Sequence, residues 1–158
     1  MDIGSGKTGS AGGLSNFRPR PFTFEDVECA SMEGLLQSFK FDKTPIQEHV
    51  CSLVGRQAKR RGSKRNKAWK SRQSLWWKGD VFKRNSPEYQ ELLDRAFFAL
   101  AAQNKGFQRA LLNSNNAVLR HSMGKSKKAD TCLTESEFCS RLMTIRDMLN
   151  DGRIDIIE

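Results

Sequence analysis

The longest regular pattern in the chain lies between residues 86 and 103, and it predicts a buried helix. The start, Ser86-Pro87-Glu88, is a strong one, because serine caps free backbone N–H groups and proline suits the first helical position. Apolar residues then recur at helical spacing, namely Leu92, Leu93, Ala96, Phe97, Ala99 and Leu100. This helix is therefore expected to belong to the core of the fold.

Shorter segments also carry helix signals, mostly polar caps that precede apolar residues. Residues 44–47 (Thr-Pro-Ile-Gln) combine a cap, a proline at the first helical position and a capping box, and Thr134-x-x-Glu137 is a second capping box. Ser31 is expected to cap another helix, with Glu33 in its first turn. The expected helices cover residues 31–41, 44 to about 55, 56–60, 107–112 and a last segment after 134.

Few segments favour strands. Residues 22–24 (Phe-Thr-Phe) and 27–29 (Val-Glu-Cys) flank Glu25-Asp26, which predicts a short hairpin or two edge strands. Residues 117–120 favour either a short strand or a helical turn. The whole pattern predicts a single domain over residues 1–158, mainly helical with a few short strands. The segments expected to form loops are 1–13, which is rich in glycine, and 124–130.

The composition is ordinary for a soluble globular protein, with 37% hydrophobic residues. No apolar run approaches the ~20 residues that a membrane span needs, and the first residues lack the apolar segment of a signal peptide. The four cysteines form no C-x-x-C pair, and neither histidine stands at metal-ligand spacing from a cysteine. We therefore expect a cytoplasmic location, reduced cysteines, no membrane association, no metal and no cofactor.

The net charge of +9 favours a polyanionic partner or substrate. Residues 59–72 contain eight Lys or Arg and only two apolar residues. Together with Trp69, Trp76 and Trp77, the segment 59–78 suits contact with DNA through phosphates and base stacking. The alternative is a solvated basic loop or helix edge that binds nothing. The expected nucleic-acid contacts are Lys64, Arg65 and Lys67.

A narrow polar stripe on the helix expected at 31–41 is the strongest candidate for a functional site. At about 100° per residue, Glu33, Gln37 and Lys40 fall within roughly a 60° arc of this otherwise apolar helix. One interpretation is a solvated face with a weak ion pair between Glu33 and Lys40. The other is a catalytic row at the edge of a cleft, with a general acid or base, an amide that orients a sugar hydroxyl, and an amine whose pKa is lowered by partial burial.

Several short motifs follow one another along the chain. They are Leu14-Ser15-Asn16-Phe17, the S-M-E-x-x-x-Q-x-x-K-F pattern of Ser31–Phe41, Val54-Gly55-Arg56, the segment 96–107 followed by Arg109-Ala110-Leu111-Leu112, and His121-Ser122. In this order and spacing they resemble the NADAR family, the YbiA-like proteins named for NAD and ADP-ribose. The resemblance extends from about residue 14 to residue 149.

The resemblance implies a compact, mostly helical α+β fold and N-glycosidase activity, the hydrolysis of a bond between ribose C1 and a nitrogen. Family substrates are reactive ribosylamines and ADP-ribose attached to guanine bases, so an ADP-ribosylated nucleotide or nucleic acid is the expected substrate. Glu33 and Lys40 match family positions and are the expected catalytic residues. Either Glu33 stabilises an oxocarbenium-like state or activates water, or Lys40 attacks C1 of an opened ribose to form a Schiff base.

The same resemblance extends to substrate binding, with either Trp77 or Tyr89 as the aromatic that contacts the base or sugar. The glycine-rich loop Gly4–Gly13 and Arg56 are expected to bind phosphates. The GSGKT sequence within this loop is not a P-loop, because Met1 stands where the first glycine is required. The expected substrate-binding residues are Asn16, Gln37, Arg56, Trp77, Tyr89 and His121.

Two segments depart from the shorter bacterial members of the family. Residues 59–85 form a long basic insertion, and residues 124–128 replace a tryptophan–glycine–aspartate–glycine segment, so the aspartate of that segment is not carried over. Similar longer members occur in phages, for which the host cytoplasm is the expected location. The alternative function is a non-catalytic module that binds ADP-ribose or nucleic acid.

Overall fold

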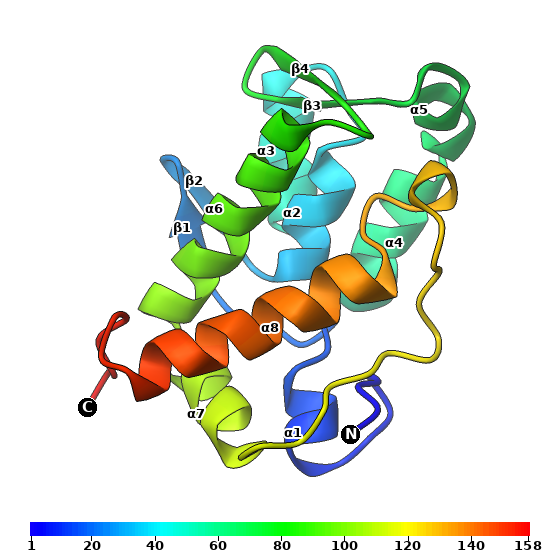
Figure 1. Ribbon diagram of the computed structural model, residues 1–158. Helices are drawn as coiled ribbons and strands as arrows, with labels where there is room; N and C mark the ends of the chain where they lie inside the picture. Colours follow the sequence, from blue (N-terminus) through cyan, green and yellow to red (C-terminus); the bar gives the residue numbers. More distant parts are fainter.

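The computed structural model describes residues 1–158 as eight α-helices, one 3-10 turn and two separate hairpins (Figure 1). The helices are α1 Gly9–Gly13, α2 Met32–Ser38, α3 Thr44–Cys51, α4 Gly55–Ser63, α5 Asn66–Arg72, α6 Pro87–Gln103, α7 Lys105–Asn113, η1 Lys128–Asp130 and α8 Glu135–Asn150. The antiparallel strand pairs are β1 Phe22–Phe24 with β2 Val27–Cys29, and β3 Ser74–Trp77 with β4 Asp80–Lys83. The mainly helical α+β class is confirmed. No helix has both the length and the hydropathy that crossing a membrane requires.

Helices α6 and α8 pack against each other and begin where the sequence predicts. The Ser86 hydroxyl accepts the Tyr89 N–H at 3.1 Å, and Thr134 and Glu137 form the predicted capping box. The apolar face of α6 is buried as predicted, so this helix belongs to the core. Its buried apolar residues include Leu92, Leu93, Ala96, Phe97 and Leu100.

Helix α2 packs against both α3 and α4 and carries the polar stripe (Figure 1). Ser31 caps it as predicted, because its hydroxyl accepts the Gly34 N–H and donates to the Leu53 carbonyl, each at 3.1 Å. Gly34 allows the close approach of this carbonyl, since a Cβ at residue 34 would lie only 2.6 Å from its oxygen. The helix ends at Ser38, earlier than expected, so Lys40 lies just beyond its last turn.

The two hairpins differ in how well the sequence predicts them. The β1–β2 hairpin is confirmed, and its turn residues Glu25 and Asp26 both have positive φ, as a two-residue hairpin turn requires. The β3–β4 hairpin lies in the basic insertion and is not predicted. Its turn is formed by Lys78 and Gly79, again with positive φ at both residues.

Two expectations about loops and short elements are corrected, and a third is narrowed to one of its two alternatives. Residues 1–13 are not all loop, because they include α1, and Asp2 forms a single parallel bridge with Arg120. Residues 117–119 form neither a strand nor a helical turn. The insertion at 59–85 consists of the end of α4, α5 and the β3–β4 hairpin, so the basic run is a helix edge and not a loop.

The capping box predicted at the start of α3 is wrong. Lys43 occupies the capping position, and no side chain caps this helix. The Gln47 side chain is buried and donates instead to the carbonyls of Phe41 and Trp76, each at 2.8 Å. Its amide oxygen accepts the Lys78 N–H, so this glutamine connects α3 to the β3–β4 hairpin.

Candidate functional site

The polar stripe of α2 ends at a cleft of about 630 Å³. Five parts of the chain line this cleft: the N-terminal region up to residue 17, Glu33 of α2, helix α4, the segment 121–125 and Phe138 of α8. A smaller cavity of about 100 Å³ adjoins it, since both are lined by Asn16, Glu33 and His121. The cleft therefore collects residues that lie far apart in the sequence.

Glu33 is the only carboxylate that lines the cleft. Its side chain is half-buried, and its backbone N–H donates to the Asn16 carbonyl at 3.1 Å, which fixes the preceding loop to the start of α2. Burial raises the pKa of this carboxyl, against the opposing effects of a hydrogen bond from Gln37 and the charges of Lys40 and Lys59. A raised pKa moves a carboxyl toward the range in which general acids and bases work.

Gln37 contacts Glu33 and is covered by α4. Its Nε2 donates to Glu33 Oε1 at 2.8 Å, and the side chain is only 6% exposed. Gly62 of α4 lies directly against it, because a Cβ at residue 62 would come within 1.8 Å of Gln37 Oε1. The hydrogen bond and the packing of α4 therefore hold Gln37 against the Glu33 carboxylate, and its expected contact with a substrate stays a prediction.

Lys40 belongs to the stripe but does not line the cleft. Its ammonium donates to Asn66 Oδ1 of α5 at 2.7 Å, and the side chain is 6% exposed. Burial lowers the pKa of this ammonium. The stripe is therefore not a solvated helix face, because the α4–α5 segment covers Gln37 and Lys40. Glu33 lines the cleft, Gln37 lines only the smaller cavity, and Lys40 lines neither.

Asn16 and His121 lie with Glu33 around the inner end of the cleft. The His121 Nδ1 atom is 2.9 Å from the Ile3 carbonyl oxygen. Since a carbonyl only accepts hydrogen bonds, Nδ1 must carry the proton, and Nε2 is the nitrogen left for a ligand. The ring also packs edge-on against Phe138, at 5.5 Å between centroids. Two residues predicted to bind substrate are thus placed beside the predicted catalytic acid.

The rim of the cleft is cationic. Arg56, which is predicted to bind phosphates, lines it together with Lys59 and Arg60 of the same helix and Lys125 from the loop after His121. Sequence reasoning assigned Lys59 and Arg60 only to the basic insertion. Their spacing of three and four residues from Arg56 places all three on one helix face, and this signal was available in the sequence.

Trp77 and Tyr89 do not line the cleft, so neither is its predicted aromatic. Trp77 is 2% exposed, packs on Phe39 and donates from Nε1 to Glu25 at 3.0 Å. Tyr89 is fully buried, and its hydroxyl donates to the Cys132 carbonyl at 2.6 Å. Both rings are core residues.

The predicted nucleic-acid contacts differ in their surroundings. Lys64 and Lys67 are exposed at the end of α4 and on α5. Arg65 is half-buried, donates from Nε to the Lys40 carbonyl at 3.2 Å and lies over the Phe41 ring. Lys64 and Lys67 are therefore available to a ligand, whereas the Arg65 guanidinium is engaged by contacts within the protein.

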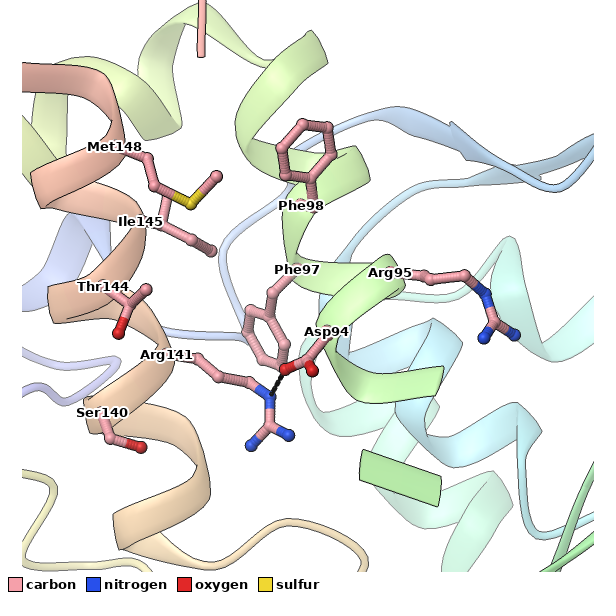
Figure 2. Close-up of a pocket in the computed structure, with 9 residues that line it drawn as sticks. All are labelled: Asp94, Arg95, Phe97, Phe98, Ser140, Arg141, Thr144, Ile145 and Met148. Carbon is pink, nitrogen blue, oxygen red and sulfur yellow. Dashed lines mark hydrogen bonds and ion pairs between the residues drawn. The ribbon is translucent and has the colours of Figure 1, made fainter. Parts of the chain in front are cut away.

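A second cleft, of about 670 Å³, lies between α6 and α8 (Figure 2). It includes the apolar side chains Phe98 and Met148, and its one carboxylate, Asp94, is paired with Arg141 at 2.8 Å. None of the predicted site residues lines it. The cleft beside Glu33 is therefore the stronger candidate for a site of chemistry.

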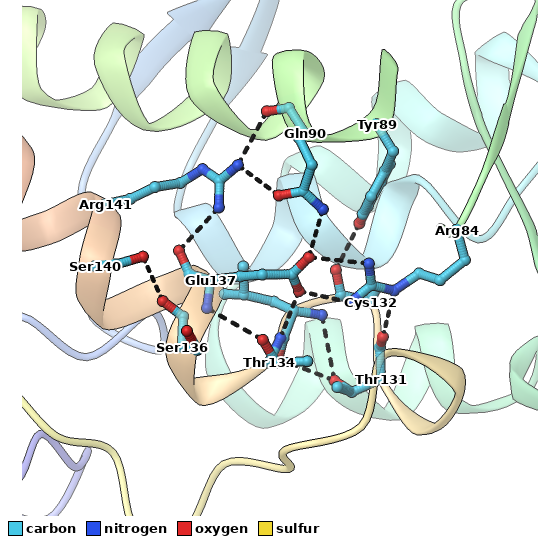
Figure 3. A network of polar contacts seen from close by, with 11 residues as sticks. Arg84, Tyr89, Gln90, Thr131, Cys132, Thr134, Ser136, Glu137, Ser140 and Arg141 are labelled. Atoms are coloured by element: carbon cyan, nitrogen blue, oxygen red, sulfur yellow. Dashed lines mark hydrogen bonds and ion pairs between the residues drawn. The ribbon is translucent and has the colours of Figure 1, made fainter. Parts of the chain in front are cut away.

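A polar network beside the second cleft was missed by sequence reasoning (Figure 3). Arg84 is 1% exposed and donates two hydrogen bonds to the Glu137 carboxylate. Glu137 also accepts from Gln90 Nε2 at 2.6 Å and from the Thr134 N–H at 2.8 Å. Burial alone would raise the pKa of Glu137, but these hydrogen bonds and the Arg84 charge lower it to about 2. No local pattern marks Arg84, because its partners lie about 50 residues away.

The fold and the cleft define a small α+β protein with one half-buried glutamate in a cationic cleft. The fold is similar to that of the E. coli protein YbiA, solved by NMR, with a TM-score of 0.64 and 16% sequence identity. The likeness covers 100% of this chain and 89% of that chain. It confirms the YbiA-like fold that the motifs predict.

The chain belongs to the family described as Bacteriophage protein GP30.3, whose family model matches residues 9–147. It is also similar to the uncharacterized 17.1 kDa protein in the Gp30-rIII intergenic region of Enterobacteria phage T4. The two are 39% identical over 137 residues, which cover 86% of this chain and 90% of the phage protein. The chain thus has a relative in a phage, as we expect for the longer members of the family.

Proposed function

We propose that the protein is an N-glycosidase that hydrolyses the bond between ribose C1 and a nitrogen, with ADP-ribose attached to a guanine base as its substrate. The observation that carries the proposal is Glu33, the only carboxylate of the cleft, whose pKa burial raises. Its setting suits a group that exchanges a proton with a substrate or a water molecule.

In the proposed reaction, the Glu33 carboxylate accepts a proton from the water that attacks C1. The C1–N bond breaks, a new C1–O bond forms, and the base nitrogen keeps the electron pair and takes up the proton that Glu33 accepted, which restores the carboxylate. The negative carboxylate also stabilises positive charge on the ribose as the bond breaks. Gln37 holds the carboxylate through its 2.8 Å hydrogen bond, and Asn16 and His121 Nε2 orient ribose hydroxyls.

The cationic rim supports a substrate that carries phosphates. Arg56, Lys59 and Arg60 lie on one side of the cleft, and Lys125 follows in the segment that also supplies His121. Guanidinium and ammonium groups are good donors to the two phosphates of an ADP-ribosyl group. A neutral nucleoside would leave this concentration of charge without a partner.

The Schiff-base route through Lys40 has less support. Its ammonium is engaged by Asn66 at 2.7 Å and lies outside the cleft, so attack on C1 would require α5 to move first. Glu33 needs no such rearrangement. We therefore assign the first step to Glu33 and a supporting role to Lys40.

The test is to incubate the protein with ADP-ribosylated guanine DNA, NAD or ribosylamine phosphates and to measure released sugar product. Glu33→Gln should lower the turnover rate by about 10²–10⁴-fold, the usual contribution of a general acid or base. Glu48→Gln, which removes an exposed carboxylate on α3, is the matched control and should retain activity. Borohydride added during turnover should trap no covalent adduct.

Two outcomes would contradict this assignment. A trapped adduct that disappears in Lys40→Gln would transfer the first step to Lys40. No release from any substrate, together with tight binding of ADP-ribose, would favour the non-catalytic binding module.

A further inference from the structure

The α4–α5 segment holds the largest concentration of unpaired charge in the protein. No Asp or Glu occurs between residues 49 and 79, and no Lys or Arg of this segment takes part in a salt bridge. Arg61 and Arg65 lie over the Phe41 ring and are half-buried. The exposed cations form what we call the basic ridge: Arg56, Lys59, Arg60, Lys64, Lys67 and Arg72.

This arrangement costs stability within the isolated chain. Arg56 lies three and four residues before Lys59 and Arg60 on α4, and like charges at these spacings destabilise a helix by about 0.2–0.5 kcal/mol per pair. No acidic residue nearby offsets the repulsion. A polyanion bound along the ridge would offset it, since each neutralised phosphate also releases condensed counterions.

The basic ridge is continuous with the candidate active site. Arg56, Lys59 and Arg60 belong to both, because they also line the cleft beside Glu33. The end of α5 is joined to the lysine-rich loop before α8 by a hydrogen bond from Gln73 Nε2 to the Ala129 carbonyl at 3.1 Å. Figure 1 shows this loop beside α4 and α5. A chain of phosphates lying on the ridge would therefore lead into the cleft.

The apolar side chains of this segment point inward. Trp69 of α5 and Ala58 of α4 are fully buried, and Trp77 of the adjoining strand is 2% exposed. A membrane-binding helix needs exposed apolar side chains to insert between lipids. No large apolar side chain of α4 or α5 is exposed. Trp76 of β3 is half-buried and packs against the core, so no fully exposed aromatic ring beside the ridge offers the platform on which single-stranded nucleic acids usually stack their bases.

We propose that the basic ridge binds the sugar–phosphate backbone of a nucleic acid strand through its phosphates alone, without stacking on its bases. The proposal rests on the proposed function in one respect, since it places the modified nucleotide of the same strand in the cleft. It predicts binding that depends strongly on salt and hardly on base sequence.

The test uses Glu33→Gln, in which turnover should be strongly reduced, and two unmodified oligonucleotides of equal length. One carries normal bases, and the other is a deoxyribose–phosphate chain without bases. Fluorescence anisotropy across a range of salt concentrations should give similar affinities for both. Adding Lys64→Gln and Lys67→Gln should reduce the slope of log affinity against log salt by about 1.4, because each contact with a single strand contributes about 0.7.

The control removes the same charge elsewhere, by Lys105→Gln and Arg109→Gln on α7, at the far end of the molecule in Figure 1, and should leave the slope unchanged. A large loss of affinity for the strand without bases, or an unchanged slope in the ridge variant, would overturn the proposal. Binding to phosphatidylserine vesicles but not to oligonucleotides would assign the ridge to a membrane. Salt-dependent binding without any glycosidase activity of the unmodified protein would refute the proposed function and leave the ridge proposal intact.

Discussion

Two glutamates, Glu33 on α2 and Glu137 on α8, lie within this fold in opposite electrostatic states. Glu137 accepts hydrogen bonds from Arg84, Gln90 and the Thr134 N–H, and its pKa is lowered to about 2. Glu33 accepts a side-chain hydrogen bond from Gln37, and burial raises its pKa. One carboxylate is fully partnered, and the other is exposed to a cleft with little support.

The difference indicates what each residue does. A buried charge with complete partners is a structural element, and removing one partner leaves the other uncompensated. A carboxyl whose burial is not compensated lowers stability, and such groups concentrate at functional sites. Substitutions at the two glutamates should therefore change stability in opposite directions.

The largest expected effect is at the Arg84–Glu137 pair. Glu137→Gln leaves the Arg84 guanidinium buried without an anion, which should lower the free energy of unfolding by about 3 kcal/mol. For a chain of this size the melting temperature should fall by about 10 °C, measured by circular dichroism. Arg84→Met combined with Glu137→Gln removes both charges and should recover much of the lost free energy of unfolding. If Glu137→Gln alone lowers this free energy by less than about 1 kcal/mol, the pair is not structural.

The same pair predicts acid sensitivity. Because the pKa of Glu137 is lowered in the folded state, its contribution is present above the unfolded value of 4.5 and is lost as the pH falls from there toward 2. The parent protein should therefore lose stability over this range more steeply than the variant with both substitutions.

The sequence predicts well those elements whose signals are local. The starts of α6 and α8 are confirmed because a cap and the first turn it satisfies involve residues only three apart, as in Ser86 with Tyr89 and Thr134 with Glu137. The β3–β4 hairpin is missed because distant residues hold its backbone: the Gln47 side chain bonds to the Trp76 carbonyl and the Lys78 N–H, and the Phe39 carbonyl accepts the Trp76 N–H. Its only local signal is the Lys78-Gly79 turn.

The features of the candidate site also differ in whether local sequence predicts them. The Glu33–Gln37 contact spans four residues of one helix, and its alignment follows from periodicity alone. The covering of Lys40 by Asn66, the burial of Trp77 and the pairing of Arg84 with Glu137 depend on packing between distant segments. No pattern within a short window could distinguish these buried side chains from exposed ones.

Gly62→Ala should disturb the less supported glutamate. The added Cβ would lie 1.8 Å from Gln37 Oε1 and 2.9 Å from Gln37 Cβ, so the amide must move and α4 must shift. Overpacking of this kind costs about 2 kcal/mol. Because the Gln37 hydrogen bond lowers the pKa of Glu33, its loss should move the Glu33-dependent limb of the pH–rate profile to higher pH. An unchanged profile with reduced stability would show that Gln37 does not position Glu33.

Glu33→Gln should have the smallest effect on stability and the opposite sign to Glu137→Gln. Because the pKa of Glu33 is raised in the folded state, its favourable contribution is present below the unfolded value of 4.5 and is lost as the pH rises through the folded value. At neutral pH the ionised carboxylate therefore opposes folding, and its removal should stabilise the protein by about 1 kcal/mol.

Urea unfolding at pH 4 and pH 8 tests this sign, since the gain should be present at pH 8 and nearly absent at pH 4. The exposed Glu48→Gln should change stability by less than about 0.5 kcal/mol at either pH. A loss of stability in Glu33→Gln at pH 8 would mean that Lys40 and Lys59 compensate the carboxylate as fully as Arg84 compensates Glu137. The contrast between the two glutamates would then fail, and with it the electrostatic argument that Glu33 is the catalytic acid or base.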